Sequence, residues 1–153
     1  MCIRDSPYTN DICAHWRFKT PKIAMMSAHT IFDMYLDYLE QEDFIGMDMC
    51  RKFLEMGHTR SRRYANHRDG KKYDKEGNVI PQEPDHATCH FAKSAKIFKK
   101  VRDIVAKNDT YVKMRKHWRK EVEQSQEARV TALANASNVT RAQYTKSKVS
   151  RAA

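Results

Sequence analysis

The apolar positions of this chain recur at spacings of three and four residues, a pattern that predicts amphipathic helices along most of its length. A first helix is expected to begin at Thr20 and Pro21, because threonine is a good N-cap and proline suits the first helical position. The helix is expected to end near Glu40. Its apolar stripe consists of Ile23, Ser27, Ile31, Met34, Tyr35 and Tyr38.

A second helix is predicted after the acidic break at 40–43, with Asp43 as its cap and Gly57 as the residue that follows its C-terminus. Gly46 lies inside this helix at a cost of about 1 kcal/mol relative to alanine, which a close crossing with another helix would explain. The apolar stripe consists of Phe44, Ile45, Met49, Cys50, Phe53, Leu54 and Met56.

The region from Thr59 to Ile80 predicts shorter elements. Thr59 is expected to cap a short basic helix that runs through Ala65. Residues 71–80 predict a short β-hairpin, because an aspartate opens and a glycine closes the four-residue turn 74–77.

Two further helices follow a stiff linker that contains Pro81 and Pro84. Asp85 is expected to cap the third long helix, and Asp109 is expected to cap the fourth. The apolar stripe of the third helix consists of Phe91, Ala95, Phe98, Val101, Ile104 and Val105. That of the fourth consists of Tyr111, Met114, Trp118 and Val122.

These elements predict a mainly α fold of about four helices around one small core, with a basic loop and a short β-hairpin, as one domain over 7–127. Residues 1–6 resemble a translated sequencing-adapter artefact and are expected to be a non-native leader in place of a missing native N-terminus. If that missing segment adds strands, the fold is α+β. Residues 128–153 have five basic and no acidic residues, which predicts a frayed helix passing into a disordered basic tail.

The net charge of +10 over 153 residues favours an anionic partner, although a basic surface without a specific partner is the alternative. No apolar run approaches the roughly 18 residues of a membrane span, so a membrane protein is not expected. The four cysteines form no CxxC pair, which favours reduced thiols and a cytoplasmic location. Nothing in the sequence indicates an oligomeric state.

Residues 51–74 form the most basic segment, with eight positive and three negative side chains. Arginine presents a planar fork of donors that matches phosphate, and tyrosine and asparagine add stacking and hydrogen bonding. The segment therefore predicts a site for nucleic acid or a phosphorylated small molecule, with a solvated basic face as the alternative. The candidate ligand-binding residues are Arg60, Arg62, Arg63, Tyr64, Asn66, Arg68, Lys71, Lys72 and Tyr73.

His67 is the candidate catalytic residue, acting as a general acid or base in a small enzyme for a phosphorylated metabolite or nucleotide. His58, which follows Gly57, is the second choice. Asn66, Arg63 and Lys72 would orient the substrate. This hypothesis predicts a concave, partly buried His67, whereas plain nucleic-acid binding predicts a convex basic face. Turn geometry alone is the alternative explanation for Asn66 and His67. A third hypothesis is a protein-interaction module whose basic loop docks an acidic partner.

No metal and no cofactor are expected. His86 and His90 have the i, i+4 spacing of metal ligands, with Cys89 beside them, but no further ligand has a recognisable spacing. The chain also contains no phosphate-binding loop of the P-loop type, no dinucleotide-binding glycine motif and no nucleophile elbow.

The most specific strings of the chain are Thr59-Arg-Ser-Arg-Arg-Tyr-Ala-Asn-His67 and Gly70-Lys-Lys-Tyr-Asp74, with 16–24, 44–57 and 84–85 in support. Together these strings resemble a domain-of-unknown-function family of short proteins from bacteria, marine cyanophages and some fungi. The resemblance runs from about Pro7 to Trp118 and implies no assigned activity. Members of that family carry an N-terminal segment with a Gly-Arg-Gly-Glu-Gln-Gly type motif, where this chain has residues 1–6.

Overall fold

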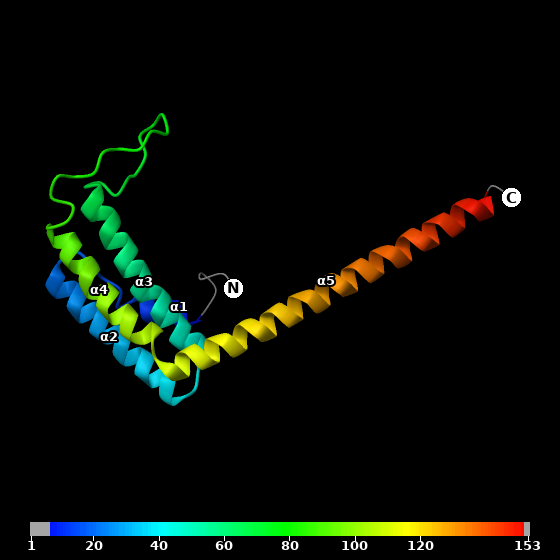
Figure 1. Ribbon diagram of the computed structural model, residues 1–153, viewed down its shortest axis with the longest axis horizontal. Helices are drawn as coiled ribbons and strands as arrows, with labels where there is room; N and C mark the ends of the chain where they lie inside the picture. Colours follow the sequence, from blue (N-terminus) through cyan, green and yellow to red (C-terminus); the bar gives the residue numbers. More distant parts are fainter. Residues whose placement is uncertain (1–6, 152–153) are drawn as a thin grey trace. The chain divides into compact units, whose positions relative to one another are not determined.

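The computed structural model describes residues 7–151, and side chains as far as residue 136; within that range it contains five helices and no strand (Figure 1). The prediction of a mainly α fold is therefore confirmed. The predicted leader, residues 1–6, lies outside the described residues. The helices are α1 (Pro7–Cys13), α2 (Pro21–Glu40), α3 (Phe44–Asn66), α4 (His90–Ala106) and α5 (Asp109–Arg151).

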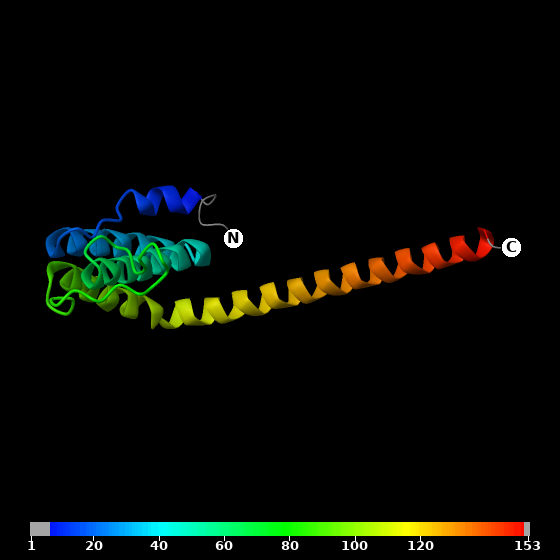
Figure 2. The same ribbon diagram turned by 90° about the horizontal axis from the view of Figure 1, so that it is seen from above.

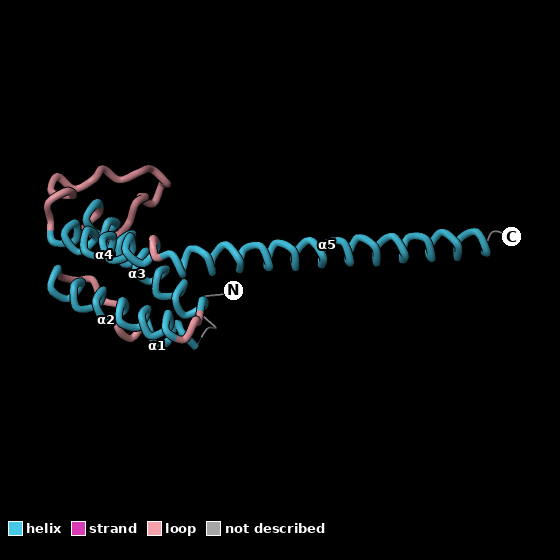
Figure 3. Tube along the Cα trace, turned by 60° about the horizontal axis from the view of Figure 1, so that its bottom comes forward, coloured by secondary structure: helices cyan, strands magenta, loops and turns pink. Residues whose placement is uncertain are grey.

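The chain divides into two units, Met1–Val112 and Lys113–Ala153. In the first unit, α3 packs against α1, α2 and α4 (Figure 3). The colours in Figures 1 and 2 show that α2 and α4 run in the same direction and that α3 runs opposite to both. Tyr111 is the last buried side chain in the described part of the sequence, and the first unit ends one residue later, at Val112. The domain expected from the sequence extends further, to residue 127.

The buried residues of the first unit come mainly from the facing sides of α2, α3 and α4. Burial raises the pKa of the Tyr35 hydroxyl and of the Cys50 thiol to about 12 each. Ile23 and Ile104 were predicted to face inward but are 38% and 53% exposed. The largest buried side chains are Tyr35, Tyr111, Phe98, Ile12, Ile31, Met47, Leu54 and Val105.

Gly57 does not end a helix, because α3 continues without a break to Asn66. A Cβ atom at Gly57 would lie 2.5 Å from the ring of Phe98, so the glycine lets α3 and α4 approach closely. The predicted helix end at Gly57 and the separate basic helix at 59–65 are both wrong for this reason. The close approach predicted for Gly46 is confirmed, since a Cβ atom there would lie 2.4 Å from the ring of Tyr38.

The predicted cap of the third long helix is also wrong, because α4 begins at His90 and Cys89 is its N-cap residue. The carbonyl oxygen of Asp85 accepts hydrogen bonds from the amides of Thr88 and Cys89, both at 2.9 Å. These bonds make a turn, so the helix starts four residues later than the aspartate signal suggested.

The predicted β-hairpin is wrong as a pair of strands, since Tyr73 and Val79 form a single antiparallel bridge. The turn itself is well made: the Asp74 carboxylate accepts from the amide of Asn78 at 2.8 Å, and Gly77 has φ +87°. The hydrogen bond from Asn78 lowers the pKa of Asp74 despite the opposing effect of desolvation. Residues 71–79 are all exposed, so they bury no face that could extend the bridge into strands.

Helix α5 continues to Arg151, through the region where the sequence predicts a frayed or disordered tail. Its sequence contains neither glycine nor proline, and it is capped by Asn108, whose side chain accepts from the Tyr111 amide at 3.0 Å. Trp118 and Val122 were predicted to face a core, but they are 41% and 36% exposed. No helix in residues 7–151 is long and apolar enough to span a membrane.

Candidate functional site

An open groove of about 350 Å³ lies between the last turns of α3 and the loop that follows it. Most of its α3 residues are spaced by three or four, so they share one face of the helix. Five of the predicted site residues meet here. The groove is lined by His58, Thr59, Arg62, Arg63, Asn66, His67, Lys72, Val79 and Gln82.

Two hydrogen bonds hold the returning loop against the end of α3. The amide of Glu83 donates to the carbonyl oxygen of Asn66 at 2.9 Å. The guanidinium of Arg62 donates to the carbonyl oxygen of His86 at 3.0 Å and to the side-chain oxygen of Asn66 at 2.8 Å. Arg62 therefore forms part of the groove wall, and both of its terminal nitrogens already donate hydrogen bonds within the chain.

His67 lies in the wall of the groove with only 7% of its surface exposed. Its amide donates to the carbonyl oxygen of Arg63 at 2.9 Å, and its own carbonyl accepts from the amide of Gly70 at 2.8 Å. Its buried ring atom Nδ1 has no hydrogen-bond partner among the residues that the structure describes. Since buried polar atoms are nearly always paired, this nitrogen has hydrogen-bonding capacity that the described residues leave unused.

Arg63 and Lys72 supply the positive charge of the groove. Neither makes an ion pair within the described residues, and none of the lining residues carries a carboxylate. The ammonium of Lys72 lies 5.3 Å from the ring centre of Tyr73, which is 53% exposed. The groove therefore combines two unpaired cations with a buried polar nitrogen, and an exposed aromatic ring lies beside it.

The other predicted site residues do not line the groove. Arg60 and Lys71 are exposed, and Arg68 is 77% exposed near Glu83 and Asp85, at 3.7 and 3.9 Å.

Tyr64 belongs to an aromatic cluster rather than to the groove. Its ring lies 5.9 Å from that of Phe18 and 5.4 Å from that of Phe91. The ring of Tyr64 therefore packs against other aromatic rings, whereas the ring of Tyr73 is exposed.

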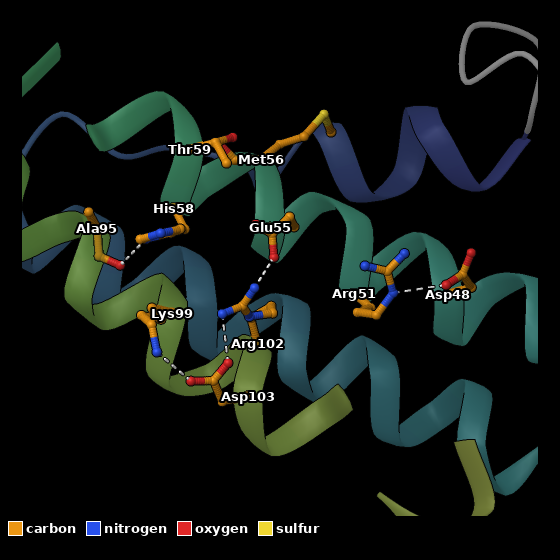
Figure 4. A network of polar contacts seen from close by, with 10 residues as sticks. All are labelled: Asp48, Arg51, Glu55, Met56, His58, Thr59, Ala95, Lys99, Arg102 and Asp103. Carbon is orange, nitrogen blue, oxygen red and sulfur yellow. Dashed lines mark hydrogen bonds and ion pairs between the residues drawn. The ribbon is translucent and has the colours of Figure 1, made fainter. Parts of the chain in front are cut away.

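Sequence reasoning missed three lining residues, Thr59, Val79 and Gln82, and ranked His58 only as the second choice of catalytic histidine. Thr59 was missed because α3 was expected to end at Gly57. A continuous helix places His58, Arg62 and Asn66 on one face at intervals of four, and that spacing is the signal that could have found them. The Nδ1 atom of His58 lies 3.1 Å from the carbonyl oxygen of Ala95, so that nitrogen already has a partner (Figure 4).

Along the middle of α3, acidic and basic side chains are paired with one another. Arg102 of α4 binds both Glu55 and Asp103, and Lys99 binds Asp103 at 2.9 Å (Figure 4). Lys99 and Arg102 are therefore engaged in ion pairs, unlike Arg63.

Near the start of α3, Asp48 accepts from Arg51 at 2.9 Å and from the hydroxyl of Tyr111 at 2.8 Å, and it pairs with Lys52 at 3.1 Å. Burial raises the pKa of Asp48, but the hydrogen bonds from Tyr111 and Arg51 outweigh burial and lower it. The carboxylate therefore stays ionised and holds its cations.

Within the described range, no group of three or more His, Cys, Asp or Glu side chains could hold a metal ion. His86 precedes α4, so it does not share a helical face with His90.

The comparisons with known proteins give one significant match. A family model with the description Domain of unknown function (DUF4385) matches residues 2–121. The resemblance to a domain-of-unknown-function family is therefore confirmed. No curated protein and no solved structure matches the chain significantly.

Proposed function

We propose that this chain, which belongs to the family Domain of unknown function (DUF4385), binds a phosphate-bearing ligand in the groove at the end of α3. The proposal rests on the buried, unpartnered Nδ1 of His67 beside two unpaired cations. Arg63 offers a planar fork of donors to a phosphate, and Lys72 adds a point charge. His67 donates from Nδ1 to a phosphate oxygen when that nitrogen carries its proton.

Nucleic acid is the first ligand class that we propose. One backbone phosphate would occupy the groove, and the exposed ring of Tyr73 would stack on a neighbouring base, a contact worth about 1–3 kcal/mol. Arg60 and Lys71 would add sequence-independent attraction from outside the groove. Single strands fit this arrangement better than duplexes, because their bases are free to stack.

The test is fluorescence anisotropy of the whole chain with labelled single-stranded DNA, duplex DNA and RNA over a salt series. Replacing Arg63 and Lys72 together by alanine should weaken single-strand binding about tenfold and reduce the slope of log K against log salt by roughly 1–2. The matched control is Lys93→Ala with Lys107→Ala, which removes the same charge from α4 and its C-cap. An unchanged slope, or an equal loss in the control, would rule out the groove as the phosphate site.

The second candidate function is an enzyme that acts on a phosphorylated metabolite or nucleotide, with His67 as acid or base. The burial of His67 in a concave groove favours it, since a plain basic face would leave the histidine exposed. Arg63 and Lys72 would hold the phosphate, and Asn66 would orient the substrate.

A panel of nucleotides and sugar phosphates would be screened for thermal stabilisation of the chain and for turnover. His67→Gln should abolish turnover of a stabilising compound and retain the stabilisation. Turnover that persists in His67→Gln would remove the acid–base role.

We place this function in the cytoplasm. Cys13, Cys50 and Cys89 are free thiols, which is typical of proteins from reducing compartments.

A further inference from the structure

A second open groove, of about 250 Å³, lies between α2 and α4 and is mainly apolar. Met25 and Ile104 in its lining are 51% and 53% exposed, and Leu36, one turn beyond Phe32, is 40% exposed. Single exposed apolar residues are ordinary, but a continuous row along two helices marks an interaction surface. The lining consists of Met25, His29, Phe32, Ile97, Val101 and Ile104, with Lys100 at the edge.

The edge of this groove on α4 is a row of lysines. Lys93, Lys96 and Lys100 follow one another at intervals of three and four, so they share the outer side of the helix, and Lys107 caps its C-terminus. All four are exposed, and none makes an ion pair within the described residues. The edge on α2 differs, because it carries Asp33 as well as a lysine, Lys22.

We propose that this groove binds an amphipathic helix of a partner protein, with the acidic flank of that helix lying along α4. An apolar trough between two helices suits the apolar face of a third helix, which inserts side chains at i, i+3, i+4 and i+7. The lysine row pairs with carboxylates on one flank of the partner, whereas Asp33 disfavours carboxylates on the other. A second copy is a poorer occupant, since each chain has a net charge of +10 and two copies repel.

The proposal is tested with a set of labelled 18-residue helical peptides. Each has leucine, isoleucine, phenylalanine or methionine on its apolar face and glutamate on one flank. A matched set carries lysine on that flank instead. Anisotropy titrations with the whole chain should show binding of at least one glutamate peptide, and its lysine counterpart should bind about tenfold more weakly or not at all.

Two pairs of variants locate the binding site. Ile104→Glu should weaken binding of the glutamate peptide about tenfold, whereas Leu133→Glu, at a more exposed position on α5, should not. Lys96→Glu with Lys100→Glu should also weaken it, and Lys113→Glu with Lys116→Glu, which changes the net charge equally, should have little effect. Circular dichroism would check that each variant remains helical.

Other outcomes would overturn the proposal. These are an absence of binding by every glutamate peptide, equal losses in a variant and its control, or equal binding of the two peptide sets. Sedimentation of the chain alone addresses the remaining occupant: a dimer that Ile104→Glu dissociates would assign the groove to a second copy.

Discussion

The two ends of α3 carry similar numbers of charged residues but use them differently. At the first end, defined by Asp48, one carboxylate binds Arg51, Lys52 and the hydroxyl of Tyr111. At the second end, defined by His67, Arg63 and Lys72 have no carboxylate beside them in the groove. The first end stabilises the fold, whereas the second leaves two cations and a buried ring nitrogen without partners among the described residues. A charged side chain without an ion-pair partner therefore indicates a candidate site better than the net charge of a segment does.

The largest effect on stability is expected at the Asp48 end. Asp48→Ala should lower the free energy of unfolding by about 3 kcal/mol, because it leaves partly buried cations without their counter-charge. Urea denaturation measures the change. Asp33→Ala is the control, since that carboxylate is exposed. Equal effects of the two substitutions on the free energy of unfolding would mean that Asp48 stabilises the fold no more than an exposed carboxylate does.

The same variant should show a defined pH dependence. The pKa of Asp48 is lower in the folded chain than its usual value near 3.9. Its contribution is therefore fully present above about pH 4–5 and is lost as the pH falls through the folded pKa. The difference between the wild type and Asp48→Ala should shrink in urea titrations below about pH 4. A difference that does not shrink would contradict the ionised state of Asp48.

Gly57 lies between the two ends and should give the next largest effect. Gly57→Ala places a Cβ atom 2.5 Å from the ring of Phe98 and should destabilise the chain by about 2 kcal/mol, although alanine is the better helix former. Phe98→Leu in the same chain should recover part of that loss, which a double-mutant cycle measures. Additive effects would mean that the ring is not the obstacle.

At the His67 end, Arg62 is expected to contribute to stability, whereas its neighbour Arg63 is expected to contribute to ligand binding. Arg62→Ala removes two hydrogen bonds and should cost about 1–2 kcal/mol of unfolding free energy. Arg63→Ala should change the stability by less than about 0.5 kcal/mol, since the structure gives it no partner to lose. Thermal denaturation distinguishes the two. Equal destabilisation would show that Arg63 is also part of the scaffold.

The smallest effect is expected for Arg68. It pairs with Glu83 and Asp85 only at 3.7 and 3.9 Å and is 77% exposed. Arg68→Ala should therefore change the unfolding free energy by no more than about 0.5 kcal/mol. A larger loss in thermal denaturation would mean that the loop depends on this ion pair.

The helices could be predicted from the sequence where their signals are local. The start of α2 at Thr20 and Pro21 and that of α3 at Asp43 follow from residues that contact their own helix. Gly57 was misread because a glycine can end a helix or permit a close crossing. The residue that decides between these meanings is Phe98, which is distant in sequence.

The candidate site was predictable in composition but not in geometry. Charge and residue type pointed to Arg63, His67 and Lys72, and all three line the groove. The burial of His67 depends on the loop that returns to Asn66 through the amide of Glu83, and no periodic pattern encodes that return. The role of Tyr64 depends on the rings of Phe18 and Phe91, which come from distant segments.

The directions of the helices have a consequence for the electric field at the His67 end. Helices α2 and α4 begin where α3 finishes, so two helix N-termini lie beside one C-terminus (Figure 1). Each N-terminus carries about +0.5 of an elementary charge and the C-terminus about −0.5, and both act over roughly one helical turn. The backbone dipoles therefore leave a positive excess at this end. We expect this backbone field to contribute to the binding of anions that we propose, so some binding should survive in the Arg63→Ala, Lys72→Ala double variant.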